Sequence, residues 1–447
     1  MAERKALGLW TLTALVVGNM IGSGVFLLPA SLAPFGGISF PGWLVSAAGS
    51  MSVGLVFARL ARRVPAAGGP YAYTRQAFGD FAGFLVGWGY WISCWSALAA
   101  IAVAMVGYLG EFIPGIATTP ALAAGTAIAA IVLLTAVNAV GVRAAGLVQF
   151  VTTVLKVLPL LGIALFGASR FELSRFEPFN PTDRPLPLAI VGCLALTLWA
   201  FLGLEAATVP AGEVREPRRT IPRATILGIS IAAALYISST GAVMGMVPRE
   251  TLAASTAPFA DAARVLWGPI GGKVVAAGAF VSCFGALNGW ILITGQIPLA
   301  IARDGLFPPL FARLGARDTP VQGLALSSVL ACALVLANFT QTLVAMFTAM
   351  ILLSTLASLI PFAFSAMAEL HLTLRERGPG LAGGVVLALV AFAYAMLAVG
   401  GAGEPTVFWG FLAFLGGIPF YVLTRWRTGA RAPEAILRPG DPGQHDS

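Results

Sequence analysis

Long apolar stretches separated by short polar connections fill almost the whole chain. An apolar stretch of about 20 residues is long enough to cross a bilayer as a helix. The pattern predicts twelve such helices, at residues 10–32, 40–60, 81–110, 121–141, 144–169, 187–210, 224–247, 273–302, 321–338, 342–370, 381–400 and 405–425. We therefore expect an all-α polytopic membrane protein with a single transmembrane domain over residues 1–425, followed by a disordered polar tail at 426–447.

Two of the predicted helices are interrupted near their middle by glycine and polar residues. The first helix contains an interruption at residues 18–24, and the sixth helix contains one at residues 199–205. The two segments lie five helices apart, so they run in opposite directions across the membrane. Paired interruptions of this kind indicate an inverted repeat with a binding site near the middle of the membrane. The repeats would cover about 10–169 and 187–370, with two further helices at about 381–425.

The residues at these interruptions predict a particular kind of binding site. Non-helical backbone is tolerated inside a membrane where it is buried in protein or lines a cavity. Unwinding at Gly22, Ser23 and Gly24 would leave free N–H groups at the start of a half-helix, which favours a carboxylate. Unwound carbonyl groups of the sixth helix could bind an ammonium group. The two breaks together predict a site for the backbone of an α-amino acid, and the alternative is that these glycines only allow close helix packing.

The composition excludes several classes of protein. Of the 447 residues, 58% are apolar and only 10% are charged, whereas soluble domains carry about 25% charged residues. A soluble enzyme, a disordered protein and a secreted disulfide scaffold are therefore excluded. The four cysteines all lie inside predicted helices, and the two histidines are too scattered for the usual metal sites and catalytic triads. We expect neither enzymatic activity nor a metal or cofactor.

The net charge of +8 is explained by the positions of the basic residues. Twenty of the 27 lysines and arginines lie in segments on the side of the N-terminus, six lie on the opposite side, and Lys156 lies inside a predicted helix. The positive-inside rule then places both termini in the cytoplasm. We therefore expect a multi-pass protein of the cell (inner) membrane, and not a protein that binds nucleic acid.

Motifs in the same order along almost the whole chain resemble those of one known family. They lie at residues 18–30, 65–73, 198–205, 216–222, 257–264 and 304–309. The chain is similar to the amino acid–polyamine–organocation (APC) superfamily, and within it to the basic amino acid/polyamine antiporters, above all those of the arginine/agmatine type. The resemblance implies a LeuT-type fold with a 5+5 inverted repeat, broken helices 1 and 6 and two extra C-terminal helices.

The resemblance also implies a function. Such a protein is a secondary active transporter that works by alternating access and exchanges a basic amino acid for its amine product, with pH-sensitive gating. Its partners are a small amino acid or amine as substrate, the surrounding lipid bilayer and, since members of the family form dimers, a second copy of the chain.

Residue by residue, the resemblance assigns the substrate backbone to the two breaks. The carboxylate is placed at the backbone around Ser23 and Gly24. The α-ammonium group is placed at carbonyl groups near Met20, Trp199 and Leu202.

The resemblance assigns further residues to the substrate side chain. Trp290 corresponds to the tryptophan that stacks on the cationic group, where cation–π attraction favours an aromatic ring; packing is the alternative. Trp199 corresponds to the aromatic residue that closes over the substrate. Ser93, Cys94 and Ser354 correspond to residues of the side-chain pocket.

Gating or proton coupling is assigned to residues at four other positions. Tyr71 and Tyr90 occupy gate positions of the family, and Glu205 occupies a position that acts in pH-dependent gating. An ionisable group inside a membrane helix is a functional candidate by default, although a structural glutamate bonded to a neighbouring helix is the alternative. Lys156 resembles a lysine of proton-coupled members that tethers helix 5 to the broken helix 1, and snorkelling to the interface is its alternative.

Two positions depart from the pattern of the basic amino acid antiporters. Leu98 stands where those antiporters carry an asparagine that holds the distal cationic group, and Lys156 stands where they carry a small apolar residue. Both departures favour a second hypothesis, a proton-coupled or exchanging permease for neutral amino acids. Competition by arginine or by alanine for uptake would separate the two hypotheses.

Overall fold

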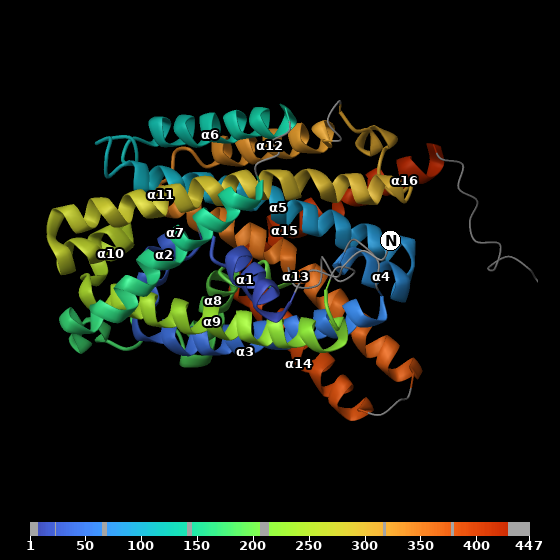
Figure 1. Cartoon of the computed structure of the whole chain (residues 1–447), viewed down its shortest axis with the longest axis horizontal. Helices are drawn as coiled ribbons and strands as arrows, with labels where there is room; N and C mark the ends of the chain where they lie inside the picture. Colours follow the sequence, from blue (N-terminus) through green and yellow to red (C-terminus); the bar gives the residue numbers. More distant parts are fainter. Residues whose placement is uncertain are drawn as a thin grey trace, which may run out of the picture.

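The computed structural model describes residues 8–22, 24–64, 69–140, 145–205, 214–315, 319–376 and 380–427, with the backbone alone for 145–155 and 427. Eight helical stretches in this part are long and apolar enough to cross a membrane, and three further apolar helices are shorter. Figure 1 shows these helices running side by side as a bundle. The prediction of a polytopic helical membrane protein agrees with this architecture.

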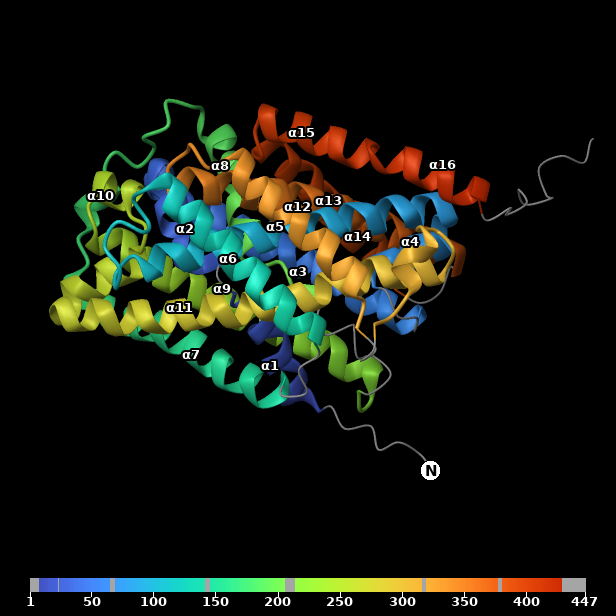
Figure 2. The same cartoon turned by 90° about the horizontal axis from the view of Figure 1, so that it is seen from above.

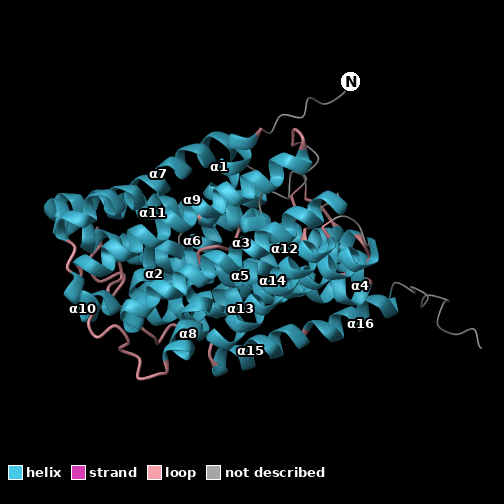
Figure 3. Ribbon diagram, turned by 90° about the horizontal axis from the view of Figure 1, so that it is seen from below, coloured by secondary structure: helices cyan, strands magenta, loops and turns pink. Residues whose placement is uncertain are grey.

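The α-helices are, in chain order, α1 (Leu9–Met20), α2 (Gly24–Leu32), α3 (Ser39–Arg63), α4 (Pro70–Phe78), α5 (Asp80–Leu109), α6 (Pro120–Val140), α7 (Ala145–Phe166), α8 (Leu186–Trp199), α9 (Pro217–Met246), α10 (Arg249–Ala254), α11 (Pro258–Arg303), α12 (Val321–Ala337), α13 (Leu343–Glu376), α14 (Leu381–Gly401), α15 (Glu404–Leu415) and α16 (Gly417–Arg427). Short 3-10 helices are η1 (Ala33–Ile38), η2 (Gly167–Arg170), η3 (Leu173–Phe176) and η6 (Pro309–Ala312). Within the described residues there is no β-strand (Figure 3).

The helix α5 lies at the centre of the bundle. In its most apolar stretch 89% of the residues are buried, and it packs against α11 and α13. On one side α3 packs against α8, α9 and α14, while α6 packs against α5 and α12. The helices α15 and α16 lie along the outside of the bundle, as Figure 2 shows, and only 6% of the residues in their most apolar stretch are buried.

The outer surface of the bundle carries large apolar side chains. Ile270 is 78% exposed, Trp409 is 65% exposed and Val329 is 63% exposed. An apolar surface of this extent is unfavourable in water, and it suits contact with lipid.

Several helices differ in extent from the predicted ones, and each difference has a local cause. The regular helix at the sixth predicted position ends at Trp199, where the predicted interruption at 199–205 begins, and residues 206–210 lie outside the described part of the chain. α11 begins at Pro258 and bends at Gly268, whose φ of +71° is a conformation that glycine adopts without strain. The last predicted helix, 405–425, is divided at Gly416 into α15 and α16. Most of the predicted tail, from residue 428 onward, lies outside the described residues.

At one end of the bundle, ion pairs join different helices. We call this the arginine-rich end, and it contains Arg59, Arg63 and Glu369. Glu369 of α13 is fully buried and pairs with Arg59 and with Arg63 of α3, the latter at 3.0 Å. Arg63 also reaches the exposed Glu376 at 3.3 Å. The opposite end of the bundle carries α10 (Figure 1).

Candidate functional site

The first predicted break is present in the structure. The helix α1 ends at Met20, Ile21 and Gly22 are not helical, and α2 begins at Gly24. Every residue of α2 is buried. The first N–H groups of a helix have no partner within it and carry partial positive charge. The start of α2 therefore presents donors in the interior of the bundle. Ser23 lies outside the described residues.

The second predicted break follows α8. Beyond Trp199 the chain continues in tight turns, in which the N–H of Leu202 donates to the carbonyl of Trp199 at 3.2 Å and the N–H of Leu204 to Phe201 at 3.2 Å. Gly203 has a φ of +100°, and a β-carbon at this position would stand 3.1 Å from the carbonyl oxygen of Asn19. The two breaks therefore touch each other, and glycine is the residue that fits between them.

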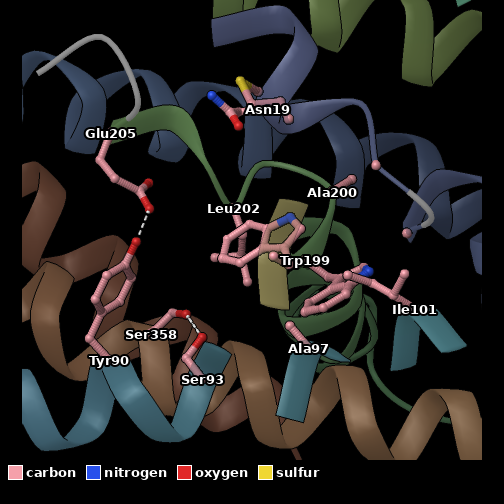
Figure 4. Close-up of a pocket in the computed structure, with 14 residues that line it drawn as sticks. Asn19, Tyr90, Ser93, Ala97, Ile101, Trp199, Ala200, Leu202, Glu205 and Ser358 are labelled. Carbon is pink, nitrogen blue, oxygen red and sulfur yellow. Dashed lines mark hydrogen bonds between the residues drawn. The ribbon is translucent and has the colours of Figure 1, made fainter. Parts of the chain in front are cut away.

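A pocket opens between the two breaks and the central helices α5, α11 and α13 (Figure 4). It is lined by Asn19, Met20, Gly22, Gly24, Tyr90, Ser93, Ala97, Ile101, Trp199, Ala200, Leu202, Glu205, Trp290 and Ser358. The free space is about 30 Å³, which is room for about two water molecules and too little for an amino acid. The side chains of the wall must move before a molecule of that size can enter.

Trp199 closes the pocket on the side of the first break. A β-carbon at Gly24 would collide with the indole ring, whose Nε1 is the nearest atom and whose Cδ1 would lie 2.6 Å away. Figure 4 shows Trp199 between Ala97, Ile101 and Leu202. The absence of a side chain at Gly24 is therefore what allows the ring to occupy this position.

A hydrogen bond joins α5 to the segment after α8 at another wall of the pocket. The hydroxyl of Tyr90 donates to Oε1 of Glu205 at 2.7 Å (Figure 4). Glu205 is only 6% exposed, and it is the carboxyl group among the described lining residues. The sequence predicted roles for both residues but not their contact.

Three serines join α5 to α13 at the base of the pocket. The hydroxyls of Ser93 and Ser358 lie 2.5 Å apart, and the hydroxyl of Ser354 donates to the carbonyl of Ser93 at 2.8 Å. Ser93 and Ser358 line the pocket, whereas Ser354 is fully buried behind it.

Of the residues predicted for the substrate site, Met20, Gly24, Ser93, Trp199, Leu202 and Trp290 line the pocket. Cys94 and Leu98 of α5 lie behind its wall, almost completely buried. The face of α5 that lines the pocket consists of Tyr90, Ser93, Ala97 and Ile101, which recur at helical spacing. Ala97, rather than its neighbour Leu98, therefore forms the wall.

The two remaining predicted residues lie away from the pocket. Lys156 of α7 is 3% exposed, on a helix that packs against α9 and α11, and it is not among the lining residues. Its proposed link to the broken first helix stays a prediction. Tyr71 of α4 lies at the arginine-rich end, where its hydroxyl donates to Oδ2 of Asp304 at 2.7 Å.

The surroundings of Tyr71 form a network at the end of α11. Arg75 contacts the same oxygen of Asp304 at 2.8 Å and Oδ1 of Asp80 at 2.8 Å, and Arg425 of α16 reaches Asp80 at 3.4 Å. Burial and the hydrogen bond to Asp304 raise the pKa of the Tyr71 hydroxyl above its ordinary value. The phenol therefore stays protonated at neutral pH and acts as a donor that joins α4 to α11.

The sequence of this chain is similar to one family model and to several known transport proteins. A family model described as amino acid permease matches residues 7–423. The chain is 36% identical to the cadaverine/lysine antiporter of Escherichia coli (strain K12), over 75% of this chain and 76% of the relative. It is 33% identical to a putative arginine/ornithine antiporter of Bacillus subtilis (strain 168), over 89% and 92% of the two chains. It is also 33% identical to the putrescine transporter PotE of Escherichia coli (strain K12), over 93% and 95%.

Proposed function

Because the chain belongs to the amino acid permease family of the APC superfamily, we propose that it exchanges a basic amino acid for a diamine or related amine across the cell membrane. The observation that carries this proposal is the single carboxyl group, Glu205, among the described lining residues of a pocket that is otherwise uncharged. A buried carboxylate attracts cations strongly where water is excluded. A cationic substrate therefore suits this pocket better than a neutral one.

The substrate backbone is held by the two helix breaks. The carboxylate lies at the start of α2, next to the backbone of Gly24, where the helix dipole is positive. Ser23, to which the resemblance also assigns the carboxylate, lies outside the described residues. The α-ammonium group lies near the carbonyls of Met20, Trp199 and Leu202. The carbonyls of Met20 and Trp199 each accept one backbone hydrogen bond, and a carbonyl has a second lone pair for the ammonium.

The substrate side chain extends toward α5 and α11. Trp290 lines the pocket and offers a ring face on which an ammonium or guanidinium group can stack. The serines Ser93 and Ser358 and the pair of Tyr90 and Glu205 supply polar groups for its charged end. A terminal ammonium group requires only such acceptors, because it donates hydrogen bonds and accepts none.

Transport proceeds by alternating access in a fold of twelve spans with two inverted five-helix repeats. The breaks at Met20–Gly24 and after Trp199 correspond to the paired discontinuous helices of such folds. Trp199 closes over the substrate, and Tyr90, Tyr71, Glu205 and Lys156 take part in gating or proton coupling. The arginine-rich end faces the cytoplasm, as the positive-inside rule requires.

Exchange by the purified protein in proteoliposomes tests this proposal. Vesicles are loaded with cadaverine, putrescine or agmatine, and uptake of labelled lysine, ornithine or arginine is measured. We expect uptake with at least one matched pair, competition by the unlabelled cation, and little competition by alanine. Competition by alanine and not by any cation would contradict the proposal and favour the neutral amino acid permease, the specificity that Leu98 suggests.

A further inference from the structure

The indole N–H of Trp199 is a buried donor that has no acceptor within the described part of the chain. Trp199 is 6% exposed, and its Nε1 has no hydrogen-bond partner among the residues that the structure describes. Buried N–H groups in proteins are nearly always paired. An unpaired donor in the wall of a binding pocket therefore marks a position where a ligand can supply the acceptor.

This donor faces the start of α2. Among the described atoms outside Gly24, its chain neighbours and its own helix, Nε1 of Trp199 lies nearest to the point where a β-carbon of Gly24 would stand. Gly24 is the first residue of a helix of nine residues, and Gly22, Gly24 and Trp199 all line the same pocket. The indole N–H and the first N–H groups of α2 therefore converge on one small region.

The chemistry of this region selects its ligand. All of the converging groups are donors, and the helix start adds partial positive charge. A carboxylate has two oxygens that accept hydrogen bonds and carries the complementary charge, whereas an ammonium group has no acceptor. An amine that lacks the carboxylate leaves the indole N–H unpaired.

We propose that Nε1 of Trp199 donates a hydrogen bond to the substrate carboxylate and so distinguishes an amino acid from its decarboxylated amine. This inference rests on the proposed function, because it assumes that both molecules bind between the two breaks. Within the side chain of Trp199, the ring contacts the two substrates alike, and the N–H is the group that separates them, together with the first N–H groups of α2.

Replacement of the indole by a ring without the N–H tests the proposal. Binding of lysine and cadaverine, ornithine and putrescine, and arginine and agmatine is measured by calorimetry on the full-length protein and on Trp199→Phe. For the pair that the unsubstituted protein binds, we expect the affinity for the amino acid to fall about 10- to 100-fold, the loss of a hydrogen bond to a charged group. The affinity for the amine should change less than about twofold by the same reasoning.

A matched control is Trp95→Phe. Nε1 of Trp95 is also buried without a partner, but Trp95 does not line the pocket, so its replacement should leave both affinities unchanged. In 3-benzothienylalanine, sulfur takes the place of the indole N–H and the shape of the ring is kept. Replacement of Trp199 by this amino acid is the second test variant if Trp199→Phe does not fold.

Each outcome bears on the inference. Selective loss of amino acid binding in either variant supports it. Equal losses for both partners, no loss, or a greater loss for the amine would overturn it, because the ring and not the N–H would then determine affinity. If the unsubstituted protein binds none of the three pairs, the proposed function is wrong and the inference fails with it.

Discussion

At the scale of single residues, closure of the pocket by Trp199 depends on the absence of a side chain at Gly24. Gly24 and Gly22 lie two positions apart in the same helix break, yet their surroundings differ. A β-carbon at Gly24 would overlap the ring of Trp199, whereas one at Gly22 would have no atom within 4 Å. The two glycines therefore form a natural pair for testing how the pocket closes.

Gly24→Ala should impair closure of the pocket by Trp199. Overpacking of a tight contact costs about 1–3 kcal/mol, so the closed arrangement should become about 5- to 150-fold less populated. We expect a comparable fall in the exchange rate in proteoliposomes, while Gly22→Ala should retain most of the activity. Equal activity of the two variants would show that the contact of Trp199 with Gly24 is unimportant for transport.

Glu205→Gln should flatten the dependence of the exchange rate on pH. Glutamine can still accept the hydrogen bond from Tyr90, but it cannot gain or lose a proton. The rate is measured between pH 5 and pH 8, because the pKa values of buried carboxyl groups can lie in about this range. Tyr90→Phe is the control, because it removes the hydrogen bond and keeps the titratable carboxyl group. A profile of Glu205→Gln with the original slope would exclude Glu205 as the titrating group.

At the scale of helices, buried and exposed ion pairs on α13 allow a direct comparison. Glu369 has no exposure and pairs with two arginines of α3, whereas the side chain of Glu376 is 54% exposed and contacts only one of them, at 3.3 Å. Glu369→Gln removes this carboxylate from both arginines and leaves Arg63 with Glu376 alone. The change should lower the unfolding free energy by about 3 kcal/mol. Glu376→Gln should lower it by less than about 1 kcal/mol.

The measurement for this pair is thermal unfolding of the purified protein in detergent. The expected result is a clearly lower midpoint for Glu369→Gln and a midpoint close to that of the unsubstituted protein for Glu376→Gln. Similar midpoints for both variants would mean that the contacts of Glu369 with α3 contribute little to stability.

Helices and their interruptions could be predicted from the sequence because both depend on local composition. The break at Ile21 and Gly22 and the end of α8 at Trp199 follow from glycine and polar residues inside apolar stretches. The division at Gly416 and the bend at Gly268 were not predicted, since single glycines inside apolar helices are common. Gly268 adopts a φ of +71°, which glycine allows, whereas Gly416 keeps helical angles and only the end of the hydrogen-bonded helix marks the division.

The candidate site was only partly predictable for a different reason. Met20, Gly24, Trp199, Leu202 and Trp290 were expected and do line the pocket. The contact between Tyr90 and Glu205 joins residues 115 positions apart, and no local pattern specifies such a pairing. The choice of Ala97 over Leu98 as a wall residue depends on the rotation of α5 about its axis, which packing against α11 and α13 determines.

At the scale of the whole molecule, the two ends of the bundle should lie on opposite sides of the membrane. Thr118 is exposed at the end that carries α10, and Leu310 is 51% exposed beside the arginine-rich end. The excess of arginine predicts that the second position faces the cytoplasm. A maleimide that does not cross membranes should therefore label Thr118→Cys in intact cells and label Leu310→Cys only after the cells are opened.

The native cysteines interfere little with this measurement, because Cys94, Cys193 and Cys283 are buried and Cys332 is half-buried. The unsubstituted protein gives the background. Labelling of Leu310→Cys in intact cells, with protection of Thr118→Cys, would reverse the proposed orientation.

The contact between Gly203 and the carbonyl of Asn19 has a consequence for building chimeras. The two breaks are far apart in the sequence but share one interface, where a β-carbon on Gly203 would stand only 3.1 Å from the carbonyl oxygen of Asn19. Residues 18–24 and 199–205 therefore form a single interchangeable module. A chimera that takes one segment from a relative must take the other as well, and specificity can be transplanted between these transporters only as a matched pair.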